Sequence, residues 1–244
     1  MKLCIYFLEY LTKQLRLSFF YALLVLCLLV TSSPTLQAEA KTDKSFIIGT
    51  SQEIDTLHPM IWTMTATLYV YNMIARTLVS QNREMQLVPQ LAESIPTLEN
   101  KQATLVKVDG VSKIIATWKI RQNAKWGDGV PISCNDFAFT KKVSLSENVA
   151  VATREPYNKA EKIACDPKDP KLVKITYRNT IWDFNRMLQF YLLPSHLEES
   201  IFNKYGPEKL SYDSHSLYTT QPTNAGLYSG PYVVSEVKLG SHIQ

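Results

Sequence analysis

The residues able to act as nucleophiles are few, and their spacing matches no catalytic pattern. A serine hydrolase presents its nucleophile in a Gly-x-Ser-x-Gly turn, whereas Ser229 stands one position too late between Gly226 and Gly230. Cys134 is expected at a helix start, which can lower a thiol pKa, but no catalytic signature surrounds it. Asp128 lies in a turn, where a carboxylate usually accepts hydrogen bonds from nearby backbone amides. We therefore expect a protein that is not an enzyme.

Metal-ligating residues are also scattered. The histidines are His58, His196, His215 and His242. None of them pairs with a cysteine at the spacing of a zinc site, so we expect no metal and no cofactor. Cys134 and Cys165 would meet an oxidising compartment if the chain is exported. A disulfide between them and two buried free thiols both remain open, because sequence separation does not give distance in space.

The first forty residues have the composition of an export signal. Basic residues precede an uninterrupted apolar run over 17–30, and Ala38-Glu39-Ala40 ends the stretch. A basic start, an apolar middle and an Ala-x-Ala exit predict a signal peptide over 1–40, and hence a periplasmic mature chain. The alternative is an uncleaved N-terminal membrane anchor, because about 20 apolar residues can span a bilayer.

Composition excludes several other classes of protein. Of the 244 residues 45% are hydrophobic, which is typical of a globular chain. The net charge of +4 is spread along the sequence rather than gathered in a basic patch, so we expect no nucleic-acid partner. Glycine occurs 8 times, and Gly127-Asp128-Gly129 is not followed by the third glycine of a phosphate-binding loop.

The elements that must position these residues alternate between strands and helices, which predicts a mixed α/β fold. Apolar runs and period-two alternation predict strands over 46–50, 114–121, 173–178 and 232–237. Apolar residues at helical spacing predict helices over 64–79, 134–145, 181–191 and 195–205. The polar stretches 81–100 and 211–223 are expected to be a connection and a surface loop.

Two of the expected helices begin with the residues of a capping box. Ser133 is followed three residues later by Asp136, and Ser195 likewise by Glu198. In such a box the hydroxyl accepts from a first-turn amide while the acid complements the helix dipole. The turn at 126–129, Trp-Gly-Asp-Gly, precedes the first box, and we expect it to serve in chain reversal and packing.

Several segments, taken in order, resemble the extracellular solute-binding proteins of family 5, which deliver oligopeptides, dipeptides or nickel to ABC importers. The most specific is 116–137, ATWKIRQNAKWGDGVPISCNDF, which is similar to the family pattern tftLRkgvkWsDGtPvtAdDv almost position by position. The other similar segments are 48–60 (IGTSQEIDTLHPM), 74–79 (IARTLV), 87–94 (LVPQLAES), 193–198 (LPSHLE) and 230–234 (GPYVV).

The resemblance implies a type II periplasmic binding protein fold, a mixed sheet with flanking helices in two lobes that close on a ligand. Residues 41–244 would form the N-terminal part of that domain, with most of the second lobe absent. Family members would act as monomers that capture a short peptide or similar small solute without chemistry. They would then pass it to an ABC permease in the inner membrane.

The same resemblance places the loop after the first strand at the border of the ligand cleft. The residues concerned are His58, Pro59, Met60, Ile61 and Trp62. A flat aromatic wall beside backbone hydrogen-bonding groups suits an extended ligand, although Trp62 could instead pack beneath the following helix. A membrane-tethered lobe that transports nothing and a secreted hydrolase are the alternative functions. Peptide is chosen over nickel, haem or sugar as the commonest ligand of the family.

Overall fold

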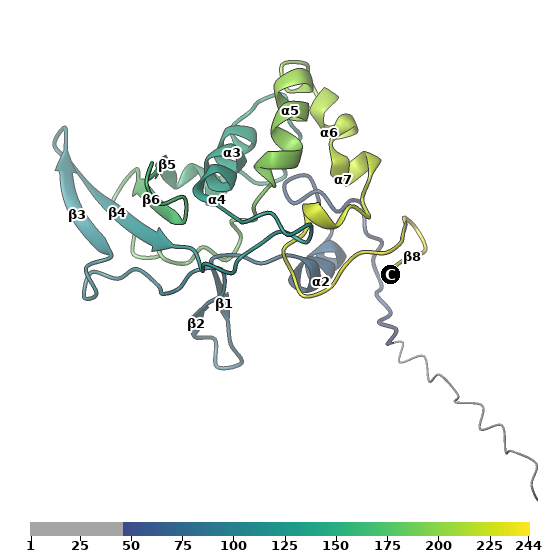
Figure 1. Cartoon of the computed structure of the whole chain (residues 1–244), viewed down its shortest axis with the longest axis horizontal. Coiled ribbons are helices and arrows are strands. Elements are labelled where there is room, and N and C mark those ends of the chain that lie inside the picture. The colour runs from purple at the N-terminus through teal and green to yellow at the C-terminus, as the bar shows by residue number, and fades with distance from the viewer. Residues whose placement is uncertain (1–45) are drawn as a thin grey trace, which may run out of the picture. The chain divides into compact units, whose positions relative to one another are not determined.

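The centre of the fold is a four-stranded antiparallel sheet with strand order β3–β4–β6–β5 (Figure 1). Its strands are β3 (Ala103–Val108), β4 (Val111–Lys119), β5 (Ala160–Cys165) and β6 (Leu172–Tyr177). Along β4 the buried residues Ile114, Ala116 and Trp118 alternate with partly exposed ones. Because successive strand residues point to opposite faces, this pattern gives the sheet one buried face. The predicted strands over 114–121 and 173–178 are confirmed, with β4 starting three residues earlier.

The computed structural model describes residues 46–244, of which 49–244 form one compact unit. The expected signal peptide, 1–40, lies outside the described residues. Among residues 46–244, no helix combines the length and the apolar character needed to cross a bilayer.

Helix α3 (Cys134–Ser144) covers the buried face of the sheet, where it contacts β5 and β6. The predicted capping box is present: the Ser133 hydroxyl accepts from Asn135 N, and Asp136 Oδ2 accepts from Ser133 N at 2.8 Å. Inside the core, Phe137 stacks on Phe190. Local capping and an apolar stripe therefore fix this helix against the sheet.

Cys134 and Cys165 are joined by a disulfide, with Cα atoms 5.5 Å apart. Cys134 is the first residue of α3 and Cys165 the last of β5. Of the two alternatives left open by the sequence, the structure has the disulfide, which ties the helix start to an edge strand.

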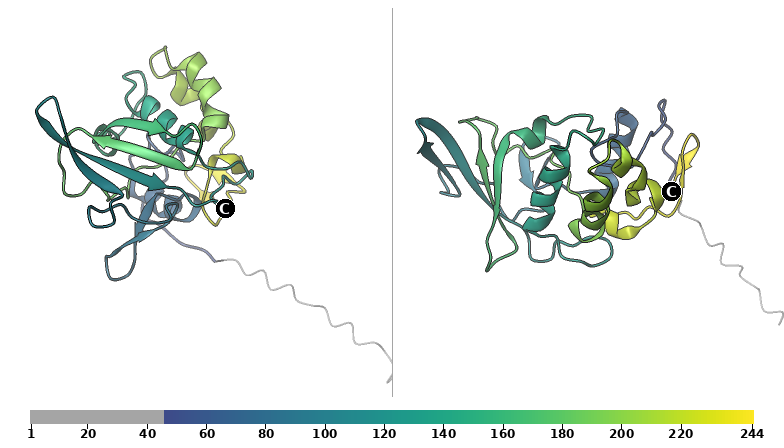
Figure 2. Two further views of the ribbon diagram at one scale, coloured as in Figure 1. Left: turned by 60° about the vertical axis from the view of Figure 1, so that its left-hand side comes forward. Right: turned by 90° about the horizontal axis from the view of Figure 1, so that it is seen from above.

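A second helical layer lies on the far side of α3 from the sheet (Figure 2). It contains α5 (Ser195–Tyr205), α6 (Ser211–His215) and α7 (Leu217–Thr220). The predicted surface loop over 211–223 is wrong, because α6 and α7 bury Tyr212 and Tyr218. The prediction failed because it relied on the average polarity of the segment, which its serines and threonines raise although the two tyrosines belong to the core.

The predicted helix over 64–79 is too long. Helix α2 (Thr65–Ile74) ends where Ala75 adopts an extended conformation, with ψ at 156°. Leu78 and Val79 are still buried, but they reach the core through a hairpin of β1 (Val79–Gln81) and β2 (Leu87–Pro89). The expected connection over 81–100 therefore contains a strand pair, which projects from the body of the fold in Figure 1.

Two predicted strands near the ends of the described residues are wrong. The run 46–50 forms no strand, and Phe46 and Ile47 are 87% and 89% exposed. In the predicted strand 232–237 only Val237 is extended and paired, as part of β7 (Val237–Lys238) with β8 (His242–Ile243). An apolar run becomes a buried strand only beside a partner strand. Among the described residues, no strand pairs with 46–50, and β8 pairs with 232–237 only at Val237.

The predicted helix over 181–191 is also wrong. This segment is irregular, and the nearest helix before it is the short α4 (Glu155–Asn158). Phe184 and Tyr191 are buried as their spacing suggests, but the carbonyl of Phe184 accepts from the Tyr177 hydroxyl. The spacing therefore predicted correctly that these residues are buried, but the prediction of a helical backbone was wrong.

Helix α5 begins at the predicted Ser195, but without the predicted capping box. Its N-cap is Pro194, and the amide and hydroxyl of Ser195 both donate to Asp136 Oδ1 on α3. Glu198 turns away from the helix start to accept from the Tyr212 hydroxyl at 2.6 Å and from Leu217 N at 2.8 Å. Tertiary partners have replaced the local ones.

Candidate functional site

The loop before α2 is held by Asp55. Its Oδ2 accepts from the amide and the hydroxyl of Thr63, both at 2.8 Å, and its Oδ1 accepts from the Thr67 hydroxyl at 3.1 Å. Burial alone would raise the pKa of Asp55, but these hydrogen bonds to the charged form outweigh it and lower that pKa. The carboxylate thus fixes both ends of the turn that contains the predicted ligand-binding residues.

His58 is fully buried within this turn. Its Nδ1 accepts from Met60 N at 3.2 Å, so the neutral ring carries its proton on Nε2. Edge-to-face contacts join the ring to Tyr212 and Tyr218, with centroids 5.7 and 5.1 Å away. Burial disfavours the charged imidazolium and lowers the pKa of His58 to about 3. Within residues 46–244, Nε2 has no hydrogen-bond partner.

The five predicted cleft residues share one turn, but their side chains point to different environments. His58, Pro59 and Met60 are buried, while Ile61 and Trp62 are partly exposed. The amides of Ile61 and Trp62 both donate to the carbonyl of His58, at 3.3 and 3.4 Å. Of the five, only Ile61 and Trp62 therefore have side-chain surface that is exposed.

Buried tyrosines surround the turn. The Tyr71 hydroxyl donates to the carbonyl of Leu57, and the Tyr218 hydroxyl to that of Leu227. Burial raises the pKa of both phenols, so both remain protonated donors at neutral pH. Sequence reasoning missed this support. Tyr218 lies far from the loop along the chain, and no local pattern shows that the hydroxyl of the nearby Tyr71 turns back to the carbonyl of Leu57.

Two other aromatic residues, Tyr191 and Trp182, differ in their exposure. Tyr191 is buried in contact with Tyr71, whereas Trp182 is 83% exposed. Tyr69 on α2, which the sequence did not single out, is 56% exposed. Its position outside the apolar stripe of α2 could have predicted this exposure.

The Trp126–Gly129 turn is used for packing. Gly129 has φ at +90°, and Gly127 N donates to the carbonyl of Tyr228. A Cβ at Gly127 would lie 2.4 Å from the carbonyl oxygen of Ala225, in the short helix η1 (Ala225–Leu227), so only glycine fits.

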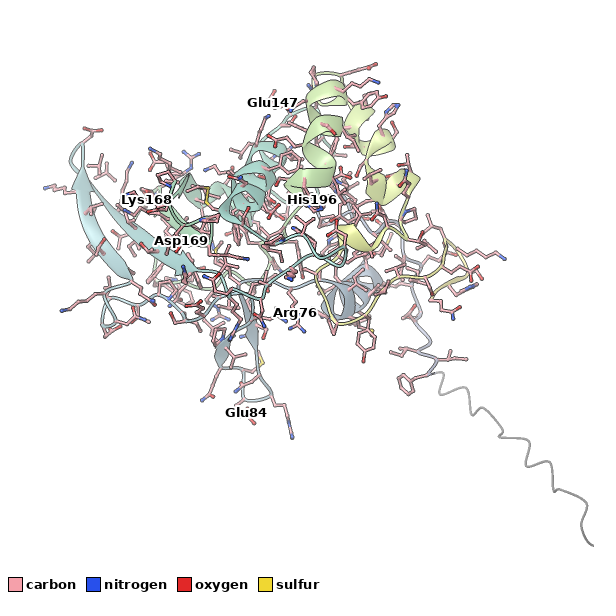
Figure 3. The ribbon with its side chains drawn as sticks, viewed as in Figure 1. Arg76, Glu84, Glu147, Lys168, Asp169 and His196 are labelled. Carbon is pink, nitrogen blue, oxygen red and sulfur yellow. A yellow bond between two sulfur atoms is a disulfide. The ribbon has the colours of Figure 1, made fainter. Side chains whose placement is uncertain are left out.

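Asp128 of the same turn also reaches α5. Its Oδ1 accepts from Val130 N at 3.0 Å, as expected for a turn carboxylate, and its Oδ2 pairs with His196 Nε2 at 2.8 Å. Figure 3 places His196 at the start of α5. Burial would raise the pKa of Asp128, but hydrogen bonds from Val130 and His196 lower it overall. The pair joins the turn to the second helical layer.

The remaining buried charges are committed to structural contacts. Asp136 accepts from Ser133 and Ser195, and Glu198, whose pKa is raised by burial, accepts from Tyr212 and Leu217. Lys171 donates to the carbonyls of Ala124 and Ile132. Among residues 46–244, no group of three or more His, Cys, Asp and Glu side chains is arranged to hold a metal ion.

Comparison with known proteins gives consistent results. The family model for bacterial extracellular solute-binding proteins, family 5 (middle), matches residues 86–244. The periplasmic murein peptide-binding protein MppA of Escherichia coli is 25% identical over 122 residues, covering 47% of this chain and 20% of MppA. The oligopeptide-binding protein AppA of Bacillus subtilis is 23% identical over 207 residues, covering 81% of this chain and 32% of AppA.

Solved structures agree with the sequence matches. The oligopeptide-binding protein of Thermus thermophilus, complexed with a pentapeptide, superposes with a TM-score of 0.61 at 18% identity. The match covers 75% of this chain and 33% of that one, so the chain spans about a third of this relative. The shared fold is the type II periplasmic binding protein fold, of which these residues cover a part. The family match over more than half of the chain shows that it belongs to the bacterial extracellular solute-binding proteins of family 5.

Proposed function

We propose that this chain belongs to the periplasmic solute-capturing component of an ABC importer, and that the solute is a short peptide. The observation that carries the proposal is the family match across residues 86–244. The names of the relatives MppA and AppA, both peptide-binding proteins, favour peptide over other solutes. Capture would proceed by closure of two lobes and requires no chemistry, and a monomer would deliver the solute to a cognate inner-membrane permease.

Within the described lobe, Ile61 and Trp62 are the proposed ligand contacts. Both side chains are partly exposed, and the turn beneath them is fixed by Asp55 and by the buried ring of His58. A rigid turn that presents an indole offers an apolar wall at little conformational cost. His58, Pro59 and Met60 would contribute by shaping this turn.

The test is peptide binding to the protein encoded by the complete reading frame that contains these residues. We expect calorimetry to show saturable binding of short peptides. The Trp62→Ala variant should bind about tenfold more weakly, because losing roughly 60 Å² of apolar contact costs about 1.5 kcal/mol.

Trp182→Ala provides the matched control, since Trp182 is an exposed tryptophan in a different segment. Equal losses in both variants would argue against Trp62 as a ligand contact. Absence of saturable binding across a peptide library, with the protein folded, would refute peptide as the solute.

We also propose export, with removal of residues 1–40. The support is the tripartite composition of this segment and the periplasmic description of MppA. Retention of the segment would instead make the chain a membrane-tethered lobe.

A further inference from the structure

An open groove of about 770 Å³ lies beside α4 and the end of β6. Its size falls within the range of small-molecule sites, about 300–1,000 Å³. Its charged and amide lining residues are Arg154, Glu155, Asn158, Lys159, Arg178 and Asn179. Three of these carry positive charge and one carries negative charge.

Arg154 is anchored on the inner side of the groove. It is partly buried, and its Nη2 donates to the carbonyls of Ser146 and Val149 at 2.9 and 3.1 Å. These bonds use two of the five N–H donors of the guanidinium group. Among residues 46–244, its Nε and Nη1 donate to no acceptor, so one edge of the group is free.

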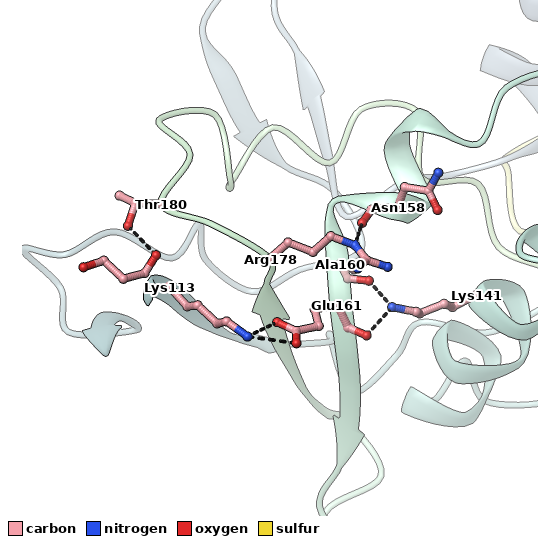
Figure 4. A network of polar contacts seen from close by, with 8 residues as sticks. Lys113, Lys141, Asn158, Ala160, Glu161, Arg178 and Thr180 are labelled. Atoms are coloured by element: carbon pink, nitrogen blue, oxygen red, sulfur yellow. Dashed lines mark hydrogen bonds and ion pairs between the residues drawn. The ribbon is translucent and has the colours of Figure 1, made fainter. Parts of the chain in front are cut away.

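Arg178 is anchored in a similar way. Its Nε donates to the carbonyl of Asn158 at 2.9 Å, as Figure 4 shows. The nearby carboxylate of Glu161 is already bound through both oxygens to Lys113, at 2.8 and 2.6 Å. Within the described part of the chain, neither Nη of Arg178 has an acceptor, and no acid forms an ion pair with it.

The other charged groups beside the groove are already held by partners of their own. Lys159 pairs with both Glu155 and Asp183, each 2.8 Å from its Nζ, so these three groups together carry one net negative charge. Lys141 donates to the carbonyls of Ala160 and Glu161, and its pKa is lowered by burial and by the charge of Arg178. Arg154 and Arg178 together carry more positive charge than this cluster offsets, and within residues 46–244 no acid forms an ion pair with either of them.

We propose that this groove binds a small oxyanion, a carboxylate or a phosphate, between Arg154 and Arg178. A guanidinium group matches the geometry of both anions through paired N–H donors. Because backbone carbonyls hold one side of each arginine, little side-chain freedom is lost on binding. The proposal does not depend on peptide capture, since it concerns a groove lined by other residues.

The experiment is an NMR titration of the full chain with inorganic phosphate and, separately, with succinate, at constant ionic strength set with sodium chloride. We expect saturable shifts of the backbone amides of Thr153, Asn179 and Ile181, which line the groove. Preference for one probe would distinguish a phosphate site from a carboxylate site.

Arg178→Gln should weaken binding at least tenfold. Arg178→Lys keeps the charge but loses the fork, so it should weaken binding less. Arg186→Gln is the matched control, because Arg186 is exposed and lies outside the groove. Unsaturable shifts with both probes, or equal affinity in Arg178→Gln, Arg178→Lys and the unmodified chain, would overturn the proposal.

Discussion

At the scale of single residues, the neutral ring of His58 links the predicted ligand loop to acid stability. The folded protein holds this ring uncharged, with a pKa of about 3, whereas an unfolded chain would titrate near the ordinary value of 6.5. Between these values the unfolded state binds more protons than the folded one. The folded state therefore loses stability as pH falls below about 6.5.

Replacing His58 should remove this pH dependence. From the two pKa values of His58, the free energy of unfolding should fall by about 2 kcal/mol when the pH is lowered from 7 to 5. In His58→Asn the amide oxygen can still accept from Met60 N, and this loss should disappear even if stability at pH 7 is lower. Urea unfolding at a series of pH values measures both effects.

His215→Asn serves as the control, because His215 is exposed in this fold. It should retain the pH dependence of the unmodified chain. If His58→Asn and the unmodified chain lose the same free energy of unfolding over this range, His58 is not a buried neutral histidine.

The grouping of His58 to Trp62 could be anticipated from the family resemblance, but their burial could not. The partners that enclose His58 are Tyr212 and Tyr218, which lie more than 150 residues later in the chain. Residue type does not reveal such partners, because a histidine in a loop is equally compatible with a surface or a core position. The uncommitted edges of Arg154 and Arg178 likewise emerge only from the folded contacts.

At the scale of elements, two similar sequence patterns had different outcomes. The box of Ser133 and Asp136 formed because both of its bonds lie within one helical turn. The box of Ser195 and Glu198 did not form, because Asp136 and Tyr212 are stronger competitors once the layers are packed. The buried face of β4 could also be predicted, because it depends only on the alternation of neighbouring residues along one strand.

The link between α3 and β5 leads to a redox prediction. The disulfide closes a loop of 31 residues, for which the chain-entropy model gives about 3–4 kcal/mol of stabilisation. We expect dithiothreitol to lower the free energy of unfolding by roughly this amount, since Cys165 is exposed to the reductant. Urea unfolding with and without the reductant measures the change.

The double variant Cys134→Ala, Cys165→Ala is the control. It should be destabilised to a similar extent and should no longer respond to dithiothreitol. If this variant is still destabilised by dithiothreitol, the effect of the reductant does not come from reduction of the Cys134–Cys165 disulfide.

At the scale of the whole molecule, the mixed α/β fold and the family could be predicted from the sequence, but the secondary structure near the two ends of the described residues could not. The segments 46–50 and 232–237 have the apolar composition of strands, yet they are largely exposed. Strand formation depends on a neighbour in the sheet, and composition carries no information about that neighbour. Local capping and alternation were therefore predictable, whereas pairing across long distances was not.

Export gives a prediction at this scale. The exported protein should begin at Lys41, with residues 1–40 removed by a signal peptidase after Ala40. Intact mass spectrometry of the periplasmic fraction measures the mass of the mature chain.

Replacing Ala38 and Ala40 with bulky residues should block cleavage and leave the precursor in the membrane fraction. An exported chain that retains its first forty residues would favour the tethered alternative.

The contact between Asp136 and Ser195 also sets an order of events during synthesis. Fifty-nine residues separate the two, so Asp136 and the start of α3 emerge long before their partner on α5 exists. Until Ser195 and His196 emerge, Asp136 and Asp128 lack their partners on α5. The two helical layers therefore assemble late. A nascent chain that stalls before residue 195 has the sheet to cover one side of α3, but it leaves Phe139 without its partner Phe202 and exposes the side that carries Phe139 to chaperones and proteases.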